Sequence, residues 1–546
     1  MAERRSGGPG RPGARPGSRS TASSAGSAGR PPPRPFRQAA HGRLRAAIAP
    51  VPGFRRRRLV TALPNPERPG QVRIGATWLL LAQGIFLITS YALHVILGRR
   101  LGPVEYGLFG IVLYTSNMVR TFVASGLPMA VGRYVSAERQ QAESVYRAGF
   151  RLQALMGLGI SLPLFLFADP LAGILGDPAL APLFRIVSPI VIFYGLFFLV
   201  IQYWNGLQKY RIQSLLMSIY YSLRLVLVVA PAVLGWHVAG AVGGLMFTSV
   251  VTGILAMAVR RPQGENDPFP QSRLIAFATP LVLASVVQAL LIDLDIMFVK
   301  RLVPATAASG WYTSAKALAQ IILFAFMALS NALYPAVSNA WAAGDTARLR
   351  RYVEQSNRWL LLTVIPLAVI TGWQAEGLLN LVYGDRYLEA APALRWLMVS
   401  FGLLSAFIIH KTIITGCGFP RLAGILTVML LPLYVVLQLV FIPRWGLAGA
   451  AAATAVSFGV GVLGSFAVVW TKVRAGLNWC STARLLGAGA GLALAEYLVS
   501  LLSLPFLPRL ILPAMVYLAL VLILGELQRA GLRDLGERYS CQGDTE

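Results

Sequence analysis

Long apolar stretches separated by short polar segments run through the chain from about residue 75 to residue 525. The stretches 78–97, 212–234 and 423–442 each approach the roughly 20 residues that a helix needs to cross a bilayer. The strands of a membrane barrel would alternate apolar and polar positions over about ten residues, and these stretches do not alternate. Because only helices and closed barrels satisfy their backbone groups in lipid, the pattern predicts an all-α polytopic membrane protein.

The same pattern predicts about fourteen membrane-spanning helices. Their expected limits are 75–98, 104–131, 150–168, 183–204, 213–234, 238–259, 274–299, 311–335, 359–375, 392–414, 422–442, 447–470, 484–503 and 508–525. The ninth of these is short, and the first two nearly merge around residues 101–107.

An internal repeat divides the predicted helices into two sets. Residues 90–115 resemble residues 293–318, because both read as a helix end, a basic pair, a short loop and the start of another helix. Six helices fall within each period, and an even number preserves orientation, as in parallel repeats about an axis along the membrane normal. The expected domains are a six-helix N-terminal lobe (74–262), a six-helix C-terminal lobe (263–472) and two additional helices (473–527).

Lys and Arg in the short loops predict the orientation of the helices. With the N-terminus inside, the inner loops carry 17 basic residues and the outer loops and helix ends carry 9. Cytoplasmic loops are enriched in Lys and Arg. We therefore expect the protein to lie in the inner membrane with both termini in the cytoplasm. The cysteines Cys417, Cys480 and Cys541 would then face the cytoplasm as free thiols, and their spacing indicates no metal site or disulfide framework.

The composition supports a membrane protein and separates a basic tail from it. The chain is 56% hydrophobic and 13% charged, whereas soluble domains carry roughly 25% charged residues. Much of the net charge of +27 lies in residues 1–73, which hold 16 Arg and two acids. This segment is rich in Arg, Pro, Gly and Ser, so we expect a disordered cytoplasmic tail. A clamp on anionic lipid headgroups is the alternative, and nucleic-acid binding is the weakest interpretation. Residues 528–546 are expected to form a second cytoplasmic tail.

Basic residues inside the predicted helices are candidates for substrate binding, because charges in a membrane are costly and usually face a cavity or a partner. Arg120 lies about 16 residues, or roughly 24 Å, into the second helix. Lys316 lies near the start of the eighth helix, the repeat equivalent of the second, so both are expected to line the gap between the lobes. Arg224, in the fifth helix, faces either this cavity or a structural partner.

Three acidic residues in the predicted helices are candidates for ion pairing or for coupling transport to an ion. Asp293 and Asp295 are two positions apart, about 200° around a regular helix, and are not expected to share a face. Asp295 is expected to pair with Lys316 or to carry a coupling proton. Glu496, in the thirteenth helix, faces either a groove for lipid tails or the outer interface. Further candidates, for sugar contacts, are Tyr91, Tyr194, Gln202, Tyr203, Trp204, Gln288 and Asn331.

Several segments resemble the polysaccharide-unit (Wzx-type) flippases of the multidrug/oligosaccharidyl-lipid/polysaccharide exporter superfamily. Residues 99–109, RRLGPVEYGLF, resemble their first outer loop, and Gly126-Leu127-Pro128 with Arg133 resembles the end of their second helix. Residues 295–300, DIMFVK, followed by Gly310-Trp311-Tyr312, resemble their seventh and eighth helices. Trp311 departs from the family pattern, because a smaller aliphatic residue is expected there.

The resemblance implies flipping of an undecaprenyl-diphosphate-linked oligosaccharide across the inner membrane for cell-surface polysaccharide biosynthesis. The implied partners are this lipid-linked oligosaccharide, membrane lipids, and candidate polymerase or assembly proteins, with no cofactor or metal. Arg120, Lys316 and Arg224 suit such a substrate, since guanidinium and ammonium groups bind phosphate.

Three alternatives stay open to different degrees. A lipid-linked peptidoglycan-precursor flippase of the same superfamily needs a cationic cavity too. A multidrug exporter of cationic compounds would favour an acidic cavity. An enzyme would need acid, base or metal-binding groups gathered on a sizeable loop, and the longest predicted outer loop, 376–391, carries no paired-carboxylate motif. We therefore predict a transporter that works by alternating access of two lobes.

Overall fold

The computed structural model describes residues 69–260, 268–502 and 504–526. Residues 1–68 of the predicted tail 1–73, the predicted tail 528–546 and Cys541 lie outside the described residues. Within those ranges every regular element is a helix, so the predicted all-α fold class is confirmed. The first helix begins at Pro69, which means that residues 69–73 are helical and do not belong to a tail.

The elements follow the predicted order along the chain. They are α2 (Pro69–Ser125), α3 (Leu127–Ala137), η1 (Arg139–Gln141), α4 (Ala142–Leu166), α5 (Ala168–Ile174), α6 (Leu180–Val187), α7 (Ile190–Gly206), α8 (Tyr210–Pro231), η2 (Ala232–Trp236), α9 (His237–Val259), α10 (Gln271–Asp293), α11 (Asp295–Leu302), α12 (Ala308–Ala342), α13 (Thr346–Tyr383), η3 (Asp385–Ala390), α14 (Ala391–Gly416), α15 (Pro420–Val473), α16 (Trp479–Ser500) and α17 (Phe506–Ile523).

Two of the longest helices, α2 and α15, are antiparallel pairs. A hydrogen bond of 2.8 Å joins His94 Nδ1 to the Tyr106 hydroxyl, although 12 residues of straight helix would span about 18 Å. Gln438 Nε2 similarly donates to Thr454 Oγ1 at 3.0 Å. The chain reverses at Gly102 and Gly446, whose φ angles of 72° and 55° lie in the region that favours glycine.

The described residues contain ten segments that are long and apolar enough to cross a membrane. The segments Thr77–Ala137 and Pro420–Val473 contain the two reversals just described, and Tyr210–Val259 contains a third at η2. The predicted ninth helix was too short: 359–375 is the middle of α13, which has 38 residues and continues through charged positions at its N-terminal end. Helix α16, the predicted thirteenth, is not among the ten segments.

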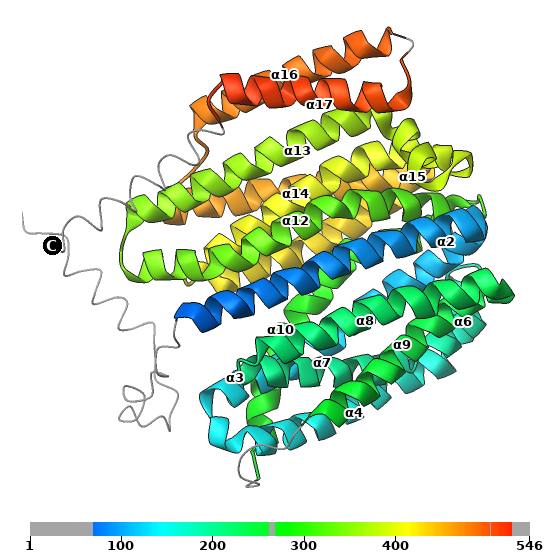
Figure 1. Cartoon of the computed structure of the whole chain (residues 1–546), viewed down its shortest axis with the longest axis vertical. Helices are drawn as coiled ribbons and strands as arrows, with labels where there is room; N and C mark the ends of the chain where they lie inside the picture. Colours follow the sequence, from blue (N-terminus) through cyan, green and yellow to red (C-terminus); the bar gives the residue numbers. More distant parts are fainter. Residues whose placement is uncertain (1–68, 261–267, 503, 527–546) are drawn as a thin grey trace, which may run out of the picture. The chain divides into compact units, whose positions relative to one another are not determined.

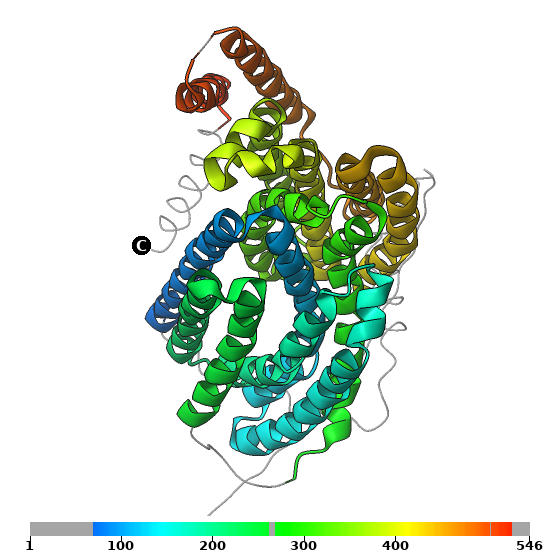
Figure 2. The same ribbon diagram turned by 90° about the vertical axis from the view of Figure 1, so that its right-hand side faces the viewer.

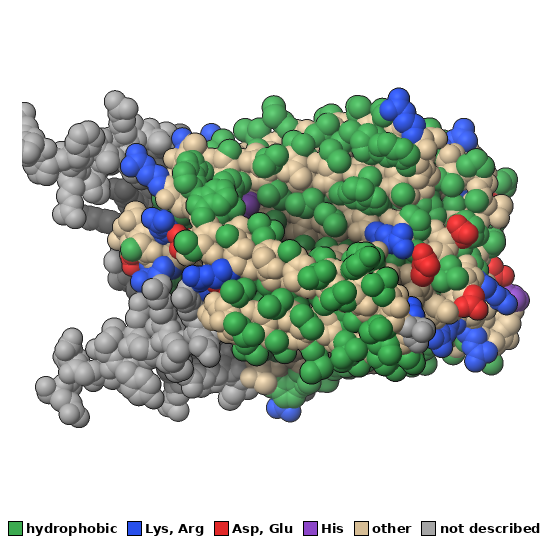
Figure 3. Space-filling view, turned by 90° about the horizontal axis from the view of Figure 1, so that it is seen from above, with side chains coloured by type: hydrophobic (Ala, Val, Ile, Leu, Met, Phe, Trp, Pro, Cys, Tyr) green, Lys and Arg blue, Asp and Glu red, His purple; other side chains and the backbone are tan. Residues whose placement is uncertain are grey.

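Two groups of helices lie on opposite sides of α2 (Figures 1 and 2). Helices α3, α4 and α6–α9 gather on one side of α2, and α12–α15 gather on the other. Helices α16 and α17 pack on α13 at the far edge of the second group. Hydrophobic side chains cover most of the face in Figure 3, with charged side chains gathered toward its two ends, as expected for a protein surrounded by lipid.

The two groups meet where α2 crosses α12. A Cβ atom added at Gly107 would lie 2.7 Å from the backbone nitrogen of Gly310, and Gly110 abuts Thr313 in the same way. The residues of each pair are 203 positions apart, which is the offset of the sequence repeat. In a contact across a twofold axis, a residue that lies on the axis meets its own equivalent. This crossing therefore has the geometry expected of two parallel repeats.

Candidate functional site

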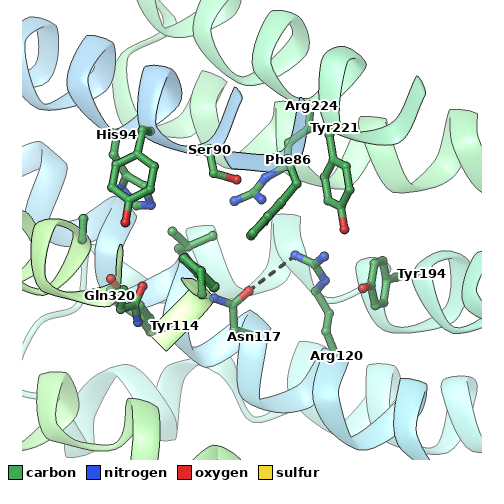
Figure 4. A pocket seen from close by; sticks show the side chains of 14 residues that line it. Phe86, Ser90, His94, Tyr114, Asn117, Arg120, Tyr194, Tyr221, Arg224 and Gln320 are labelled. Carbon is green, nitrogen blue, oxygen red and sulfur yellow. Dashed lines mark hydrogen bonds between the residues drawn. The ribbon is translucent and has the colours of Figure 1, made fainter. Parts of the chain in front are cut away.

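A cavity of about 220 Å³ lies between α2, α7, α8 and α12. Arg120 on α2 and Arg224 on α8 both line it, as Figure 4 shows. The other polar residues around it include Ser90, Tyr91, His94, Asn117, Tyr194, Tyr221 and Gln320. No aspartate or glutamate of the described chain lines this cavity, so its ionic character is basic. We refer to it below as the arginine cavity.

Arg120 is held in the arginine cavity by aromatic side chains. Its side chain is buried, and one terminal nitrogen donates to the Tyr220 hydroxyl at 2.8 Å. Its guanidinium carbon lies 3.9 Å from the centre of the Tyr194 ring, a distance at which a cation is attracted to the ring face. Asn117, one turn earlier on the same face of α2, accepts a longer contact of 3.5 Å.

The two guanidinium groups retain unused hydrogen-bonding capacity. The Nε atoms of Arg120 and Arg224 are buried and have no hydrogen-bond partner in the part of the chain that the structure describes. Within the described ranges, no carboxylate forms an ion pair with either residue, and the surrounding groups are tyrosines. Burying two like charges without counter-charge is costly. An anion in the arginine cavity would offset this cost.

Two tyrosine hydroxyl groups add further donors. The hydroxyls of Tyr91 and Tyr114 are buried and have no hydrogen-bond partner, and both residues line the cavity. A phenol can donate one hydrogen bond and accept others. The cavity thus offers two cations and at least two neutral hydroxyl groups to a polar ligand.

Lys316 lies in a second, separate cluster. It is fully buried, and its Nζ lies 2.6 Å from Asp295 Oδ1 and 3.3 Å from Asp293 Oδ1. The Ile292 carbonyl accepts a further hydrogen bond from the ammonium at 2.6 Å. Lys316 does not line the arginine cavity, whereas its neighbour Ala317 does. We refer to Lys316, Asp293 and Asp295 as the lysine cluster.

The expectation that Asp293 and Asp295 point in different directions is wrong, because the helix is interrupted between them. Helix α10 ends at Asp293 and α11 begins at Asp295. The Ile296 amide donates to the Asp295 side chain at 2.9 Å, while the Ile292 carbonyl bonds Lys316. The break lets both carboxylates reach one ammonium group, which a regular helix would not allow.

Glu496 lies apart from both clusters. It is fully buried on α16, where Gln374 of α13 donates to its Oε2 at 2.9 Å. Its Oε1 has no hydrogen-bond partner. Of the six residues proposed from the sequence, the structure thus brings Arg120 and Arg224 together, groups Lys316 with both aspartates, and leaves Glu496 in a third place.

Some residues of the arginine cavity were not foreseen from the sequence. Tyr91 and Tyr194 were among the proposed sugar contacts, but Asn117, Tyr221 and Gln320 were not. The signal for Tyr221 was its spacing from Arg224, since residues three apart on a helix are neighbours. Tyr203 and Trp204, also proposed for sugars, are buried elsewhere, in a core formed mainly by α3, α4 and α7.

Comparisons with known proteins agree with this architecture. The family model described as polysaccharide biosynthesis protein matches residues 72–341, and the MatE family model matches residues 280–440. A solved structure of the lipid II flippase MurJ, in an inward closed conformation, shares the fold with a TM-score of 0.71. It is 14% identical in sequence, and the match covers 83% of this chain and 99% of that chain.

Two curated relatives have names connected with glycan transport. The succinoglycan biosynthesis transport protein ExoT of Rhizobium meliloti is 25% identical over 57% of this chain and 62% of its own length. The probable low-salt glycan biosynthesis flippase Agl15 of Haloferax volcanii is 25% identical over 33% of this chain and 39% of its own length. The matches therefore span less than two thirds of either relative.

These matches point to transporters rather than to enzymes, and they confirm the resemblance seen in the sequence. The chain belongs to the multidrug/oligosaccharidyl-lipid/polysaccharide exporter superfamily, and its residues 72–341 match the polysaccharide biosynthesis family within it.

Proposed function

We propose that this protein flips an undecaprenyl-diphosphate-linked oligosaccharide from the inner to the outer leaflet of the cell membrane, for cell-surface polysaccharide biosynthesis. The observation that carries this proposal is the pair of guanidinium groups, Arg120 and Arg224, facing one cavity without a carboxylate partner among the described residues. A diphosphate that links a lipid to a sugar carries two negative charges, which match these two cations. The names of the glycan-transport relatives support the same substrate class.

The energetic reason is the cost of moving charge through lipid. A diphosphate headgroup cannot cross about 30 Å of hydrocarbon without compensation. Guanidinium groups bind phosphate oxygens through paired hydrogen bonds in a fixed fork. Arg120 and Arg224 would replace the water that the headgroup loses, while the lipid tail stays in the bilayer.

The size of the cavity fits transport by alternating access. Its volume of about 220 Å³ is below the roughly 300–1,000 Å³ of common ligand sites. It has room for the phosphate end, but an oligosaccharide requires the cavity to open. We propose that the two six-helix lobes, 74–262 and 263–472, rock about the crossing of α2 and α12 to open it toward each leaflet in turn.

Contacts between the two lobes at the predicted outer end would have to break in this motion. Arg99 Nε donates to the Val382 carbonyl at 2.8 Å, and the Tyr387 hydroxyl donates to the Gly98 carbonyl at 2.6 Å. Lys300 and Asp177 form an ion pair of 2.6 Å. These contacts are polar and local, so they can be exchanged for water when the lobes separate.

Transport in proteoliposomes tests the proposal. The probe is a short-chain polyprenyl-diphosphate oligosaccharide with a fluorescent label that an impermeant reductant quenches only in the outer leaflet. We expect Arg120→Ala to abolish flipping and Arg120→Lys to retain part of it, because the charge remains but the fork is lost. Arg151→Ala, which removes an exposed arginine from α4, is the matched control. Normal flipping by a well-folded Arg120→Ala protein would contradict the assignment.

A peptidoglycan-precursor flippase is the second candidate function, because the solved lipid II flippase shares the fold. Both substrates carry a polyprenyl diphosphate, and the arginine cavity suits either. Competition between lipid II and the labelled oligosaccharide in the same vesicles separates them by headgroup. An exporter of cationic drugs is disfavoured, since two arginines and no acid line the cavity.

The proposed orientation places both termini in the cytoplasm. Cys480 is exposed near the start of α16, whereas Cys417 is buried. An impermeant thiol reagent should therefore label Cys480 in inside-out vesicles and not in intact cells, and Cys417 should label in neither. This last expectation replaces the one from the sequence, which had Cys417 as accessible as Cys480. Labelling of Cys480 in intact cells would reverse the topology.

A further inference from the structure

Tyr114 lies between the arginine cavity and the lysine cluster. It is on α2, one helical turn before Asn117, and only 1% of it is exposed. Its hydroxyl has no hydrogen-bond partner although the residue lines the cavity. Figure 4 shows it among the residues that line the cavity, with Arg120 and Gln320. Because the cavity also holds Arg120 and Arg224, a buried hydroxyl without a partner among the described residues can donate to an anion that enters it.

The face of the same ring contacts Lys316. The ammonium nitrogen lies 4.4 Å from the centre of the Tyr114 ring, within the range of a cation–π interaction. On its other sides Lys316 is held by Asp295, Asp293 and the Ile292 carbonyl. Lys316 therefore cannot turn into the cavity without leaving its own partners. Tyr114 contacts Lys316 and also lines the cavity, so it can transmit the position of Lys316 to a bound ligand.

We propose that Tyr114 donates a hydrogen bond to the phosphate end of the bound substrate, and that Lys316 positions Tyr114 through the cation–π contact without touching the substrate. The inference rests on the proposed function, since it names a further residue of the same anion site. It gives Lys316 an indirect role in place of the direct phosphate contact expected from the sequence. The lysine cluster fixes the ring, and the ring fixes the hydroxyl.

The chemistry of the pair favours this arrangement. A cation over the face of a phenol attracts the ring, while the two carboxylates of the lysine cluster offset the effect of Lys316 on the hydroxyl. The interaction also holds the ring in one orientation, so less freedom is lost when the anion binds. A hydroxyl donating to a charged phosphate is expected to make a stronger hydrogen bond than one between neutral groups.

Binding of inorganic pyrophosphate to the purified full-length protein, measured by calorimetry, tests the role of the hydroxyl. We expect Tyr114→Phe to weaken binding about tenfold or more, the size of a hydrogen bond to a charged group. The matched control is Tyr203→Phe, because Tyr203 is also fully buried with an unpartnered hydroxyl but lies outside the cavity. It should bind as the unaltered protein does. Unchanged affinity in Tyr114→Phe would overturn the inference.

A double-mutant cycle tests whether Lys316 acts through Tyr114. The combined change Lys316→Met with Asp295→Asn keeps the formal charge of the lysine cluster at −1, because one cation and one anion are removed together. We expect this change to weaken pyrophosphate binding roughly three- to tenfold, the range of a buried cation–π contact. In a Tyr114→Leu background the same change should have little further effect. Equal losses in both backgrounds would show that Lys316 does not act through Tyr114.

Arg120→Ala separates failure of this inference from failure of the proposed function. If pyrophosphate binds to Arg120→Ala as tightly as to the unaltered protein, the arginine cavity is not the anion site and both proposals fall. If Arg120→Ala loses binding while Tyr114→Phe keeps it, the anion site stands and the role of Tyr114 is wrong.

Discussion

Two groups of buried cations lie on the repeat-related helices α2 and α12, and they differ in their counter-charges. Lys316 on α12 has two carboxylates and a carbonyl around its ammonium group. Arg120 on α2 has a tyrosine hydroxyl, an amide oxygen and an aromatic face, and the nearby Arg224 adds a second positive charge. The first group is compensated by the protein itself, while the second is not.

On the proposed function, this difference distinguishes a structural cluster from a ligand-binding one. A buried cation with its own carboxylates is satisfied without a ligand, and its removal chiefly harms folding. A buried cation with neutral partners must be balanced by something from outside the protein, and perturbed charges of this kind gather at functional sites. A charge inside a membrane helix is therefore an incomplete indicator of function until its partners are known.

The largest effect should come from removing Lys316 alone. Lys316→Met leaves two carboxylates buried beside each other, and breaking a buried ion pair in this way costs about 3–5 kcal/mol. We expect a large loss of thermal stability in detergent, with the loss largely restored when Asp295→Asn is added. Arg120→Met should leave the melting temperature almost unchanged or raise it. If Arg120→Met destabilises as strongly as Lys316→Met, the contrast between the two groups is wrong.

A smaller effect on anion binding is expected from changing Arg224. It would distinguish the roles of the two arginines in the arginine cavity. Arg224 is less buried than Arg120 and has no hydrogen bond to a tyrosine among the described contacts. It should contribute charge with less fixed geometry. We expect Arg224→Ala to lower pyrophosphate affinity about tenfold, and Arg224→Lys to recover most of it, in contrast with the partial recovery by Arg120→Lys. Equal recovery at both positions would show that neither site depends on the guanidinium fork.

Much of the fold follows from the sequence, because the length and apolarity of the helices are local properties. The order of the helices and the position of most spans could be predicted, although their number is not confirmed. The repeat offset of 203 reappears in the contact between Gly107 and Gly310. The charged N-terminal part of α13 could not be predicted as helix, because charged residues can continue a helix beyond the membrane as readily as they can end it.

The candidate site was only partly predictable. The depth of Arg120 in an apolar stretch singled it out, and its neighbour in the cavity, Arg224, was found in the same way. The pairing of both aspartates with Lys316 depends on a helix break at Leu294, a residue with no sequence signal for a break. The position of Tyr114 between the two clusters depends on how α2 and α12 pack, which no periodicity in one helix reveals.

The smallest effect is expected from changing Glu496. This residue extends the comparison of buried charges to an acid. It is fully buried on α16, with Gln374 as its hydrogen-bond donor and no cation partner among the described residues. An ionised carboxylate there would lack compensation, whereas a protonated one would be satisfied at little cost. Glu496→Gln keeps the shape of a neutral carboxylic acid, so we expect stability and flipping within about twofold of the unaltered protein.

Glu496→Ala should be less stable, because it removes the partner of Gln374 and leaves a cavity between α13 and α16. Thermal melting in detergent and the vesicle assay check both variants. A strong loss of flipping in a stable Glu496→Gln protein would mean that the charge of Glu496 is used during transport, and that an uncompensated acid, like the uncompensated arginines, marks function in this molecule.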